Sequence, residues 1–117
     1  MQRPDPGVYL EDIERYTEAA IRYLGGCTLN QYLADDKTRS AVERALEVAG
    51  EAMRKLAASA PEIAMRIPHS KSIIGFRNVL AHGYAEINDE KVFRIARDDA
   101  PELLAAVRAE LKDFPET

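Results

Sequence analysis

The segment Ser40–Ala57, SAVERALEVAGEAMRKLA, sets the architecture, because apolar residues recur in it every three or four positions. This spacing places them on one face of an α-helix and the charged residues on the other. The predicted apolar face comprises Val42, Ala45, Leu46, Ala49, Met53, Leu56 and Ala57. Gly50 lies within that face, where glycine costs about 1 kcal/mol of helix propensity relative to alanine. We therefore expect another backbone to pass close to Gly50.

Start and stop signals divide the rest of the N-terminal half into helices. A residue that can cap a helix precedes each apolar run, and a glycine pair follows the first run. The signals are Asp5 with Pro6 and then Gly25-Gly26 for a first helix, Thr28 with Gln31 for a short helix through Leu33, and Asp35 or Asp36 for the helix that contains Ser40–Ala57. We therefore expect two long helices joined by a short one.

The C-terminal half carries similar signals. A short helix should start at Ser59-Ala60-Pro61-Glu62, with Ser59 as its cap, and end at Pro68. The next helix should be capped by Ser70 and end at Gly83, and its apolar residues are Ile73, Ile74, Phe76, Val79 and Leu80. Asn88-Asp89 should open a further helix, and Asp98 or Asp99, followed by Pro101 and Glu102, the last one. No run alternates between apolar and polar residues, so we expect no strands. The sequence predicts an all-α fold, an up-and-down bundle of four to five principal helices.

The composition is that of one globular domain spanning residues 1–117, with 46% hydrophobic and 31% charged residues. The single Cys27 cannot form an internal disulfide, which fits a reducing cytosol. The first residues lead into no apolar run, and no stretch approaches the roughly 18 apolar residues of a membrane span. We therefore expect a cytoplasmic protein with no membrane partner.

The charge is unevenly distributed along the chain. The net charge is −4, which argues against an indiscriminate nucleic-acid binder. Between residues 52 and 85, however, five basic residues face a single acidic one, Glu62, and the net charge of the segment is +4. This basic segment is either a chance cluster of solvated side chains or the lining of a small anion-binding cleft.

Three tyrosines in the first predicted helix, Tyr9, Tyr16 and Tyr23, lie seven residues apart on one stripe with Ile13 and Ala20. A partly buried core stripe with hydroxyls at its edge accounts for this spacing. The alternative is a self-association face, since tyrosine is favoured at interfaces.

Arg77 and His82 are the residues best suited to catalysis. Five residues turn an ideal helix by about 500°, which leaves the two positions about 140° apart. Either the helix unwinds before His82, or two copies of the chain pool these residues across a symmetric interface. Histidine could move the proton of a ribose 2′-hydroxyl or of the 5′-oxygen leaving group, and arginine could stabilise charge on the phosphate. The spacing alone is equally that of a surface arginine beside a helix-ending histidine.

Other chemistry has little support in the sequence. His69, His82 and Cys27 are too few and too far apart for a metal site, and no glycine-rich phosphate loop follows a strand. We therefore expect no metal and no cofactor.

The segment Phe76–Tyr84, FRNVLAHGY, resembles the R-N-x-L-x-H-x-Y signature of the HepT-like HEPN family. Three further segments resemble the family in the same order along the chain, namely Ser40–Ala52 (its A-V-x-R-x-L-x-x-I-G-E-A helix), Pro61–Ile63 with Ile67-Pro68 (its connector) and Asp99–Leu103 (the start of its final helix). One departure is His69, which follows the connector where many relatives have tryptophan. It would alter the packing or add a cationic group near the cleft.

The resemblance implies a HEPN-like bundle that forms a homodimer or a higher oligomer, with two copies of the motif along a shared cleft. By position, it implies that Arg77 and His82 are the catalytic residues of a metal-independent endoribonuclease toxin and that Asn78 supports them. Tyr84 matches the tyrosine that a cognate MntA-like nucleotidyltransferase modifies with AMP in related type VII toxin–antitoxin pairs. The implied partners are RNA and that antitoxin, which itself would use ATP and magnesium.

Two other functions remain open. The chain could be a non-enzymatic subunit of a minimal nucleotidyltransferase, whose Arg/His/Tyr cluster binds nucleotide or the partner. It could also be a structural dimerisation domain, which would explain the tyrosine stripe and Gly50 but not the joint presence of Arg77, Asn78, His82 and Tyr84.

Overall fold

The computed structural model describes residues 5–82 and 87–114, and at residues 81 and 82 the backbone alone. Within these ranges the chain is helical and contains no strand, which confirms the all-α prediction. The elements in chain order are α1 (Pro6–Leu24), α2 (Leu29–Ala34), α3 (Asp36–Ser59), α4 (Pro61–Ala64), α5 (Ser70–His82), α6 (Asp89–Arg94), the π-helical turn η1 (Ile95–Asp99) and α7 (Ala100–Leu111).

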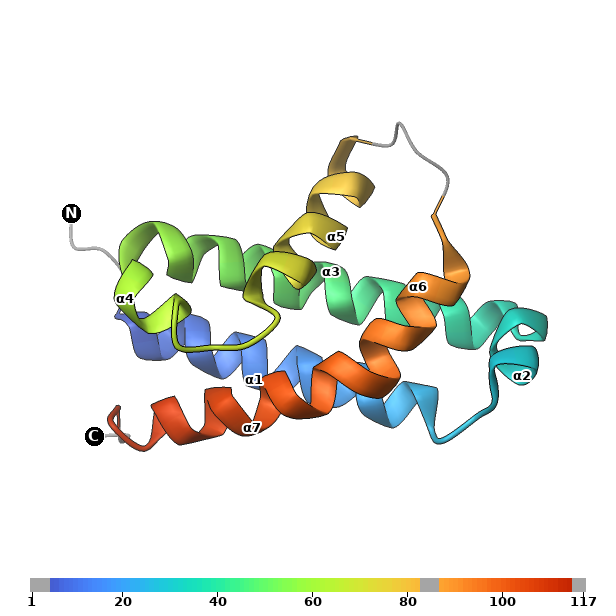
Figure 1. Cartoon of the computed structure of the whole chain (residues 1–117), viewed down its shortest axis with the longest axis horizontal. Coiled ribbons are helices and arrows are strands. Elements are labelled where there is room, and N and C mark those ends of the chain that lie inside the picture. Colours follow the sequence, from blue (N-terminus) through green and yellow to red (C-terminus); the bar gives the residue numbers. More distant parts are fainter. Residues whose placement is uncertain (1–4, 83–86, 115–117) are drawn as a thin grey trace.

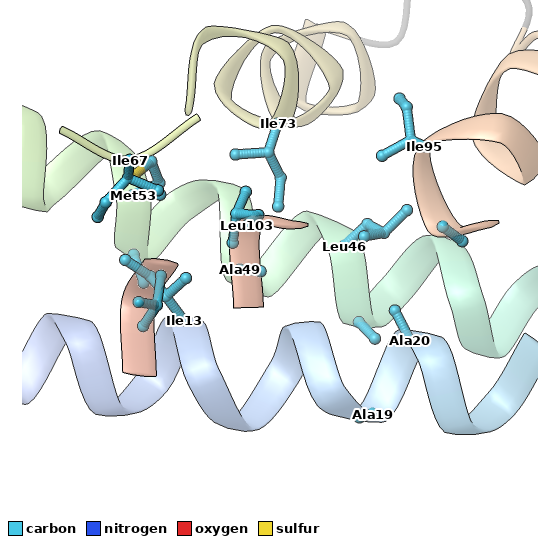
Figure 2. Packing of buried hydrophobic residues seen from close by; sticks show 14 of the residues in the cluster. Ile13, Ala19, Ala20, Leu46, Ala49, Met53, Ile67, Ile73, Ile95 and Leu103 are labelled. Carbon is cyan, nitrogen blue, oxygen red and sulfur yellow. The ribbon is translucent and has the colours of Figure 1, made fainter. Parts of the chain in front are cut away.

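Three long elements form the body of the molecule. Helix α3 runs back along α1, and α7 packs on the other side of α1 (Figure 1). Helix α5 packs against α3 but lies across it, so that its C-terminal end projects from the body (Figure 1). The apolar faces meet in one core, where Ile13, Leu46, Met53, Ile73 and Leu103 converge from α1, α3, α5 and α7 (Figure 2).

The predicted apolar face of α3 is the centre of this core. Six of its seven residues are buried, and Ala57 is partly buried. Of the tyrosine stripe on α1, Ile13 and Ala20 are fully buried, Tyr9 and Tyr16 are partly buried, and Tyr23 is exposed. The stripe therefore contributes to the core, while its exposed end leaves the self-association face a prediction.

Most of the predicted helix starts and stops are confirmed. The Asp5 carboxylate accepts the amide of Gly7 at 2.8 Å, and Thr28 and Gln31 form both bonds of the capping box. Asp35 and Asn88 likewise cap α3 and α6. Gly25 ends α1 in a left-handed conformation with φ of 61°, which glycine adopts without steric cost.

The two predicted serine caps were wrong. Helix α3 continues through Ser59, whose hydroxyl donates to the carbonyl of Lys55 at 3.0 Å. The chain leaves the helix at Ala60 instead, because Pro61 disfavours a helical backbone in the residue before it. The short helix α4 then ends at Ala64, before Pro68. Ser70 is itself the first residue of α5, so His69 stands at the position before the helix. The backbone of His69 has a φ of 65°, and its carbonyl accepts the amide of Ile73.

The predicted cap at Asp98 or Asp99 was also wrong, since the last three elements form one continuous helix through η1 (Figure 1). Neither aspartate side chain caps α7; Asp98 instead accepts two bonds from Arg97. Pro101 explains the π-turn. Its ring would clash with the carbonyl of Arg97 in a regular α-helix, and a wider turn relieves that clash.

No helix in residues 5–82 and 87–114 combines the length and the apolar character that crossing a membrane requires. The predictions for Gly83 as the end of a helix and for Tyr84 as a modified residue concern positions outside the described residues.

Candidate active site

The close crossing of α3 and α5 takes place at Gly50, as its position in the sequence predicts. A Cβ atom on Gly50 would lie 2.5 Å from the carbonyl oxygen of Ile73 and 2.7 Å from the Cβ of Arg77. Only a residue without a side chain allows this approach. The backbone that passes Gly50 is therefore that of α5, and it brings Arg77 directly over α3.

At this crossing, the guanidinium of Arg77 is held by two neighbours. Its Nη2 donates to Oε2 of Glu51 at 2.9 Å, and its Nη1 donates to Oδ1 of Asn78 at 3.0 Å. The Arg77 side chain is 25% exposed, and that of Glu51 is 34% exposed. The pair is thus partly shielded from water, so it is screened less than an ion pair in open solvent.

Glu51 has a second partner on its own helix. Its Oε1 accepts from Nε of Arg54 at 2.6 Å, so each carboxylate oxygen binds one guanidinium. The hydrogen bond from Arg54, followed by the positive charges of Arg54 and Arg77, lowers the pKa of Glu51 below its ordinary value. Arg54, Glu51, Arg77 and Asn78 therefore form a chain of charge-assisted contacts from α3 to α5.

A cavity of about 350 Å³ opens beside this chain of contacts, within the range that small ligands occupy. Helices α1, α3 and α5 supply its walls, which are formed by Tyr9, Asp12, Arg44, Glu47, Val48, Glu51, Ala52, Lys55 and Arg77. Three of these residues are basic and three acidic. Arg44 pairs with Glu47 at 3.1 Å and Arg77 with Glu51, whereas Lys55 forms no ion pair with any residue that the structure describes.

The other predicted site residues are placed as follows. Asn78 lies beside Arg77 and binds it. Helix α5 extends to His82, so it does not unwind before that residue, and positions 77 and 82 keep the separation of about 140° around one helix. The side chain of His82 and the whole of Tyr84 lie outside the described part of the chain.

His69 does not line the cavity beside Arg77. Its ring faces α7, with Nε2 at 3.3 Å from Glu102 and Nδ1 at 3.7 Å from Asp99. The histidine that stands in place of a tryptophan thus contacts the last helix, and its cationic form would interact with these two carboxylates rather than with a ligand near Arg77.

The basic segment between residues 52 and 85 does not line one cleft. Arg77 and Lys55 share the cavity, but Arg66 donates two bonds to Glu110 on α7, and Lys71 lies beside other cavities. The prediction that the whole segment lines one cleft was therefore wrong, and anion binding by the part that lines the cavity stays a prediction. No group of three or more His, Cys, Asp and Glu side chains in the described ranges is arranged to hold a metal ion.

Comparison with known proteins identifies the family of the chain. A family model described as ribonuclease HepT-like matches residues 9–110. The chain belongs to the HepT-like ribonuclease family. This match confirms the resemblance seen in the sequence, and it extends from the first turn of α1 to the last turn of α7.

Three relatives that are similar to this chain carry names of ribonucleases. A Methanocaldococcus jannaschii protein named "Putative RNase" is 30% identical over 88% of this chain and 94% of its own length. A Thermococcus cleftensis protein named "Probable ribonuclease HepT" is 30% identical over 81% and 86%, and a Caldanaerobacter subterraneus subsp. tengcongensis protein named "Putative RNase" is 31% identical over 92% and 94%. No solved structure matched this chain.

Glu51 is the residue of this candidate site that the sequence-based prediction did not single out. It lies 26 positions from Arg77 and reaches it only because α5 crosses α3. Its signals were its place directly after Gly50, the glycine that predicted a close neighbour, and its match to the glutamate of the A-V-x-R-x-L-x-x-I-G-E-A helix that Ser40–Ala52 resembles.

Proposed function

We propose that this protein is an endoribonuclease that cleaves RNA without a metal ion, with Arg77 and His82 as its catalytic residues and Asn78 as their support. Family membership supports an activity on RNA. The observation that carries the proposal is the position of Arg77, whose guanidinium lies at the wall of a cavity large enough for a nucleotide. Lys55, unpaired among the described residues, adds a positive charge to the same wall.

The proposed reaction uses the substrate's own nucleophile. The ribose 2′-oxygen attacks the adjacent phosphorus as His82 of one copy removes its proton. The bond from phosphorus to the 5′-oxygen breaks, and a protonated imidazole returns a proton to that oxygen. The products are a 2′,3′-cyclic phosphate and a 5′-hydroxyl. Arg77 stabilises the negative charge that accumulates on the phosphate oxygens during this step.

The regular course of α5 favours a site shared by two copies. The backbone positions 77 and 82 are about 140° apart around the same helix, a spacing that disfavours the use of both residues of one copy on a single phosphate. A two-fold dimer solves this by pairing Arg77 of one copy with His82 of the other. Helix α5 projects from the body and carries an exposed Val79 and a partly buried Phe76, an apolar surface suited to such a contact (Figure 1).

Cleavage of RNA in EDTA tests this proposal. Arg77→Ala and His82→Ala should each abolish cleavage, and a substrate with a 2′-deoxyribose at the cleaved position should be inert. Mixing the two inactive variants is the sharper test, because the mixed dimer keeps one intact Arg77 beside one intact His82. Random pairing should then restore about a quarter of the wild-type activity. Cleavage by either single variant at the wild-type rate would contradict the mechanism.

We further propose that the ribonuclease is the toxin of a type VII toxin–antitoxin pair in the cytoplasm. Its antitoxin would be an MntA-like nucleotidyltransferase that transfers AMP to Tyr84 and so places a bulky anion beside the motif, where it repels RNA. Coexpression with a nucleotidyltransferase encoded next to this gene should add adenylate mass to Tyr84. A Tyr84→Phe variant should gain no such mass and should remain toxic.

A second function is a non-enzymatic subunit that binds nucleotide for such a nucleotidyltransferase. The equal number of acidic and basic residues around the cavity favours it, because a polyanion is not strongly attracted to a neutral wall. Expression of this chain without the neighbouring gene separates the two, since the toxin arrests growth and the binding subunit does not.

A further inference from the structure

The Glu51 carboxylate binds two arginines at once, which a simple surface ion pair does not require. Its two oxygens bind two different guanidinium groups, Arg54 at 2.6 Å and Arg77 at 2.9 Å. Its backbone is fixed within α3, between Gly50 and Ala52, which are both buried. The carboxylate therefore stands at a defined place on the body of the molecule, while Arg77 belongs to the projecting helix.

The contacts of Arg77 with the described residues occupy only part of its guanidinium. An arginine carries five N–H donors in a planar fork. Glu51 takes one donor of Nη2 and Asn78 takes one donor of Nη1, so three donors have no partner among the residues that the structure describes and could bind an incoming phosphate. Asn78 lies on α5 itself, next to Arg77, so its contact does not connect Arg77 to another helix. Glu51 is thus the contact that fixes the fork relative to the rest of the molecule.

We propose that Glu51 is a positioning residue that fixes the guanidinium of Arg77 at the cavity wall before RNA binds. The inference rests on the proposed function for its effect on cleavage, although the anchoring itself can be measured without substrate. Fixing the fork in advance removes the entropy cost of ordering a long side chain during the reaction. The alternative is that the Glu51 carboxylate competes with the phosphate for Arg77 and has to be displaced before RNA can bind.

The first experiment measures the order of the Arg77 side chain by NMR relaxation of its Nε–Hε group, in the protein without RNA. Arg77→Lys identifies the signal. Glu51→Ala should lower the order parameter to that of an exposed arginine. Glu14→Ala is a matched control, because Glu14 of α1 likewise binds an arginine of another helix, Arg108 of α7, at 3.0 Å. In this control Arg108 retains its second partner, Glu18, just as Arg77 retains Asn78 in Glu51→Ala. The control should leave the Arg77 signal unchanged.

The second experiment measures cleavage by the same variants. Glu51→Ala should lower kcat by about 10- to 100-fold with little change in KM, since misplacement of a group by about 1 Å has an effect of this size. Glu51→Gln keeps an oxygen that can accept from Arg77 and should recover part of the rate. Glu14→Ala should cleave like the wild type.

The outcomes separate this inference from the proposed function. Failure of the wild-type protein to cleave RNA would refute the proposed function, and the NMR result alone would then decide whether Glu51 anchors Arg77. Wild-type cleavage that is lost in Arg77→Ala but unchanged or faster in Glu51→Ala would overturn the positioning role. An Arg77 signal that stays ordered in Glu51→Ala would overturn it as well.

Discussion

Replacing Gly50 by alanine tests the crossing that places Arg77. The new Cβ would lie 2.5 Å from the carbonyl oxygen of Ile73 and 2.7 Å from the Cβ of Arg77, whereas real Cβ contacts are essentially never under 3.0 Å. Because the obstacle is backbone, α5 must retreat by at least about half an ångström. Overpacking of this kind costs about 1–3 kcal/mol, and the gain in helix propensity offsets about 1 kcal/mol of it. We expect a net loss of about 1 kcal/mol in the free energy of unfolding.

Gly75→Ala is the matched control on the opposing helix. Gly75 lies in α5, is exposed, and has nothing within 4 Å of an added Cβ, so alanine should stabilise the protein by about 0.5–1 kcal/mol. Urea unfolding of both variants measures the difference, which we expect to be about 1–3 kcal/mol. RNA cleavage by Gly50→Ala should also fall, because Arg77 moves with α5. Equal stability of the two variants would refute the close crossing as the reason for glycine at position 50.

Three further predictions concern stability. Tyr32→Phe should raise the free energy of unfolding by about 1 kcal/mol, since the buried Tyr32 hydroxyl has no hydrogen-bond partner among the described residues; an unchanged or lower thermal midpoint would contradict this. Asn88→Ala should cost about 1 kcal/mol in urea unfolding, because Oδ1 of Asn88 accepts the amide of Lys91 at the start of α6. The pKa of Glu51 is lowered in the folded protein, so its contribution to stability is present above the ordinary value of 4.5 and is lost as the pH falls through the lowered pKa. The stability difference between wild type and Glu51→Gln should accordingly shrink in acid, and a difference that is independent of pH would count against the ion pair.

The sequence predicted the helices well because their signals are local. Asp5, Thr28, Asp35 and Asn88 act within three residues of their own positions, so the starts of these four helices could be identified without knowing the rest of the fold. Pro101 misled the prediction, since a proline after two aspartates is typical of a helix start. Burial of residues on both sides of the π-turn overrode that local preference.

The site could be predicted only in part. The motif identified Arg77 and its neighbour Asn78, and Gly50 predicted that a backbone would pass close to α3. Nothing in the sequence told which helix would pass, because that depends on packing between residues far apart along the chain. The contact between Glu51 and Arg77 follows from that packing and was therefore missed.

Helix α5 contributes a single fully buried side chain, Ile73, in the part of it whose side chains are described. The other positions of this part of the helix are exposed or, like Ile74 and Phe76, only partly buried, so each of them contributes less to the stability of the core than Ile73 does. Random mutagenesis of α5 should therefore yield many variants that are soluble and folded yet altered in activity. An engineer could change the preference of the site by redesigning this one helix, with the frame of α1, α3 and α7 left as it is.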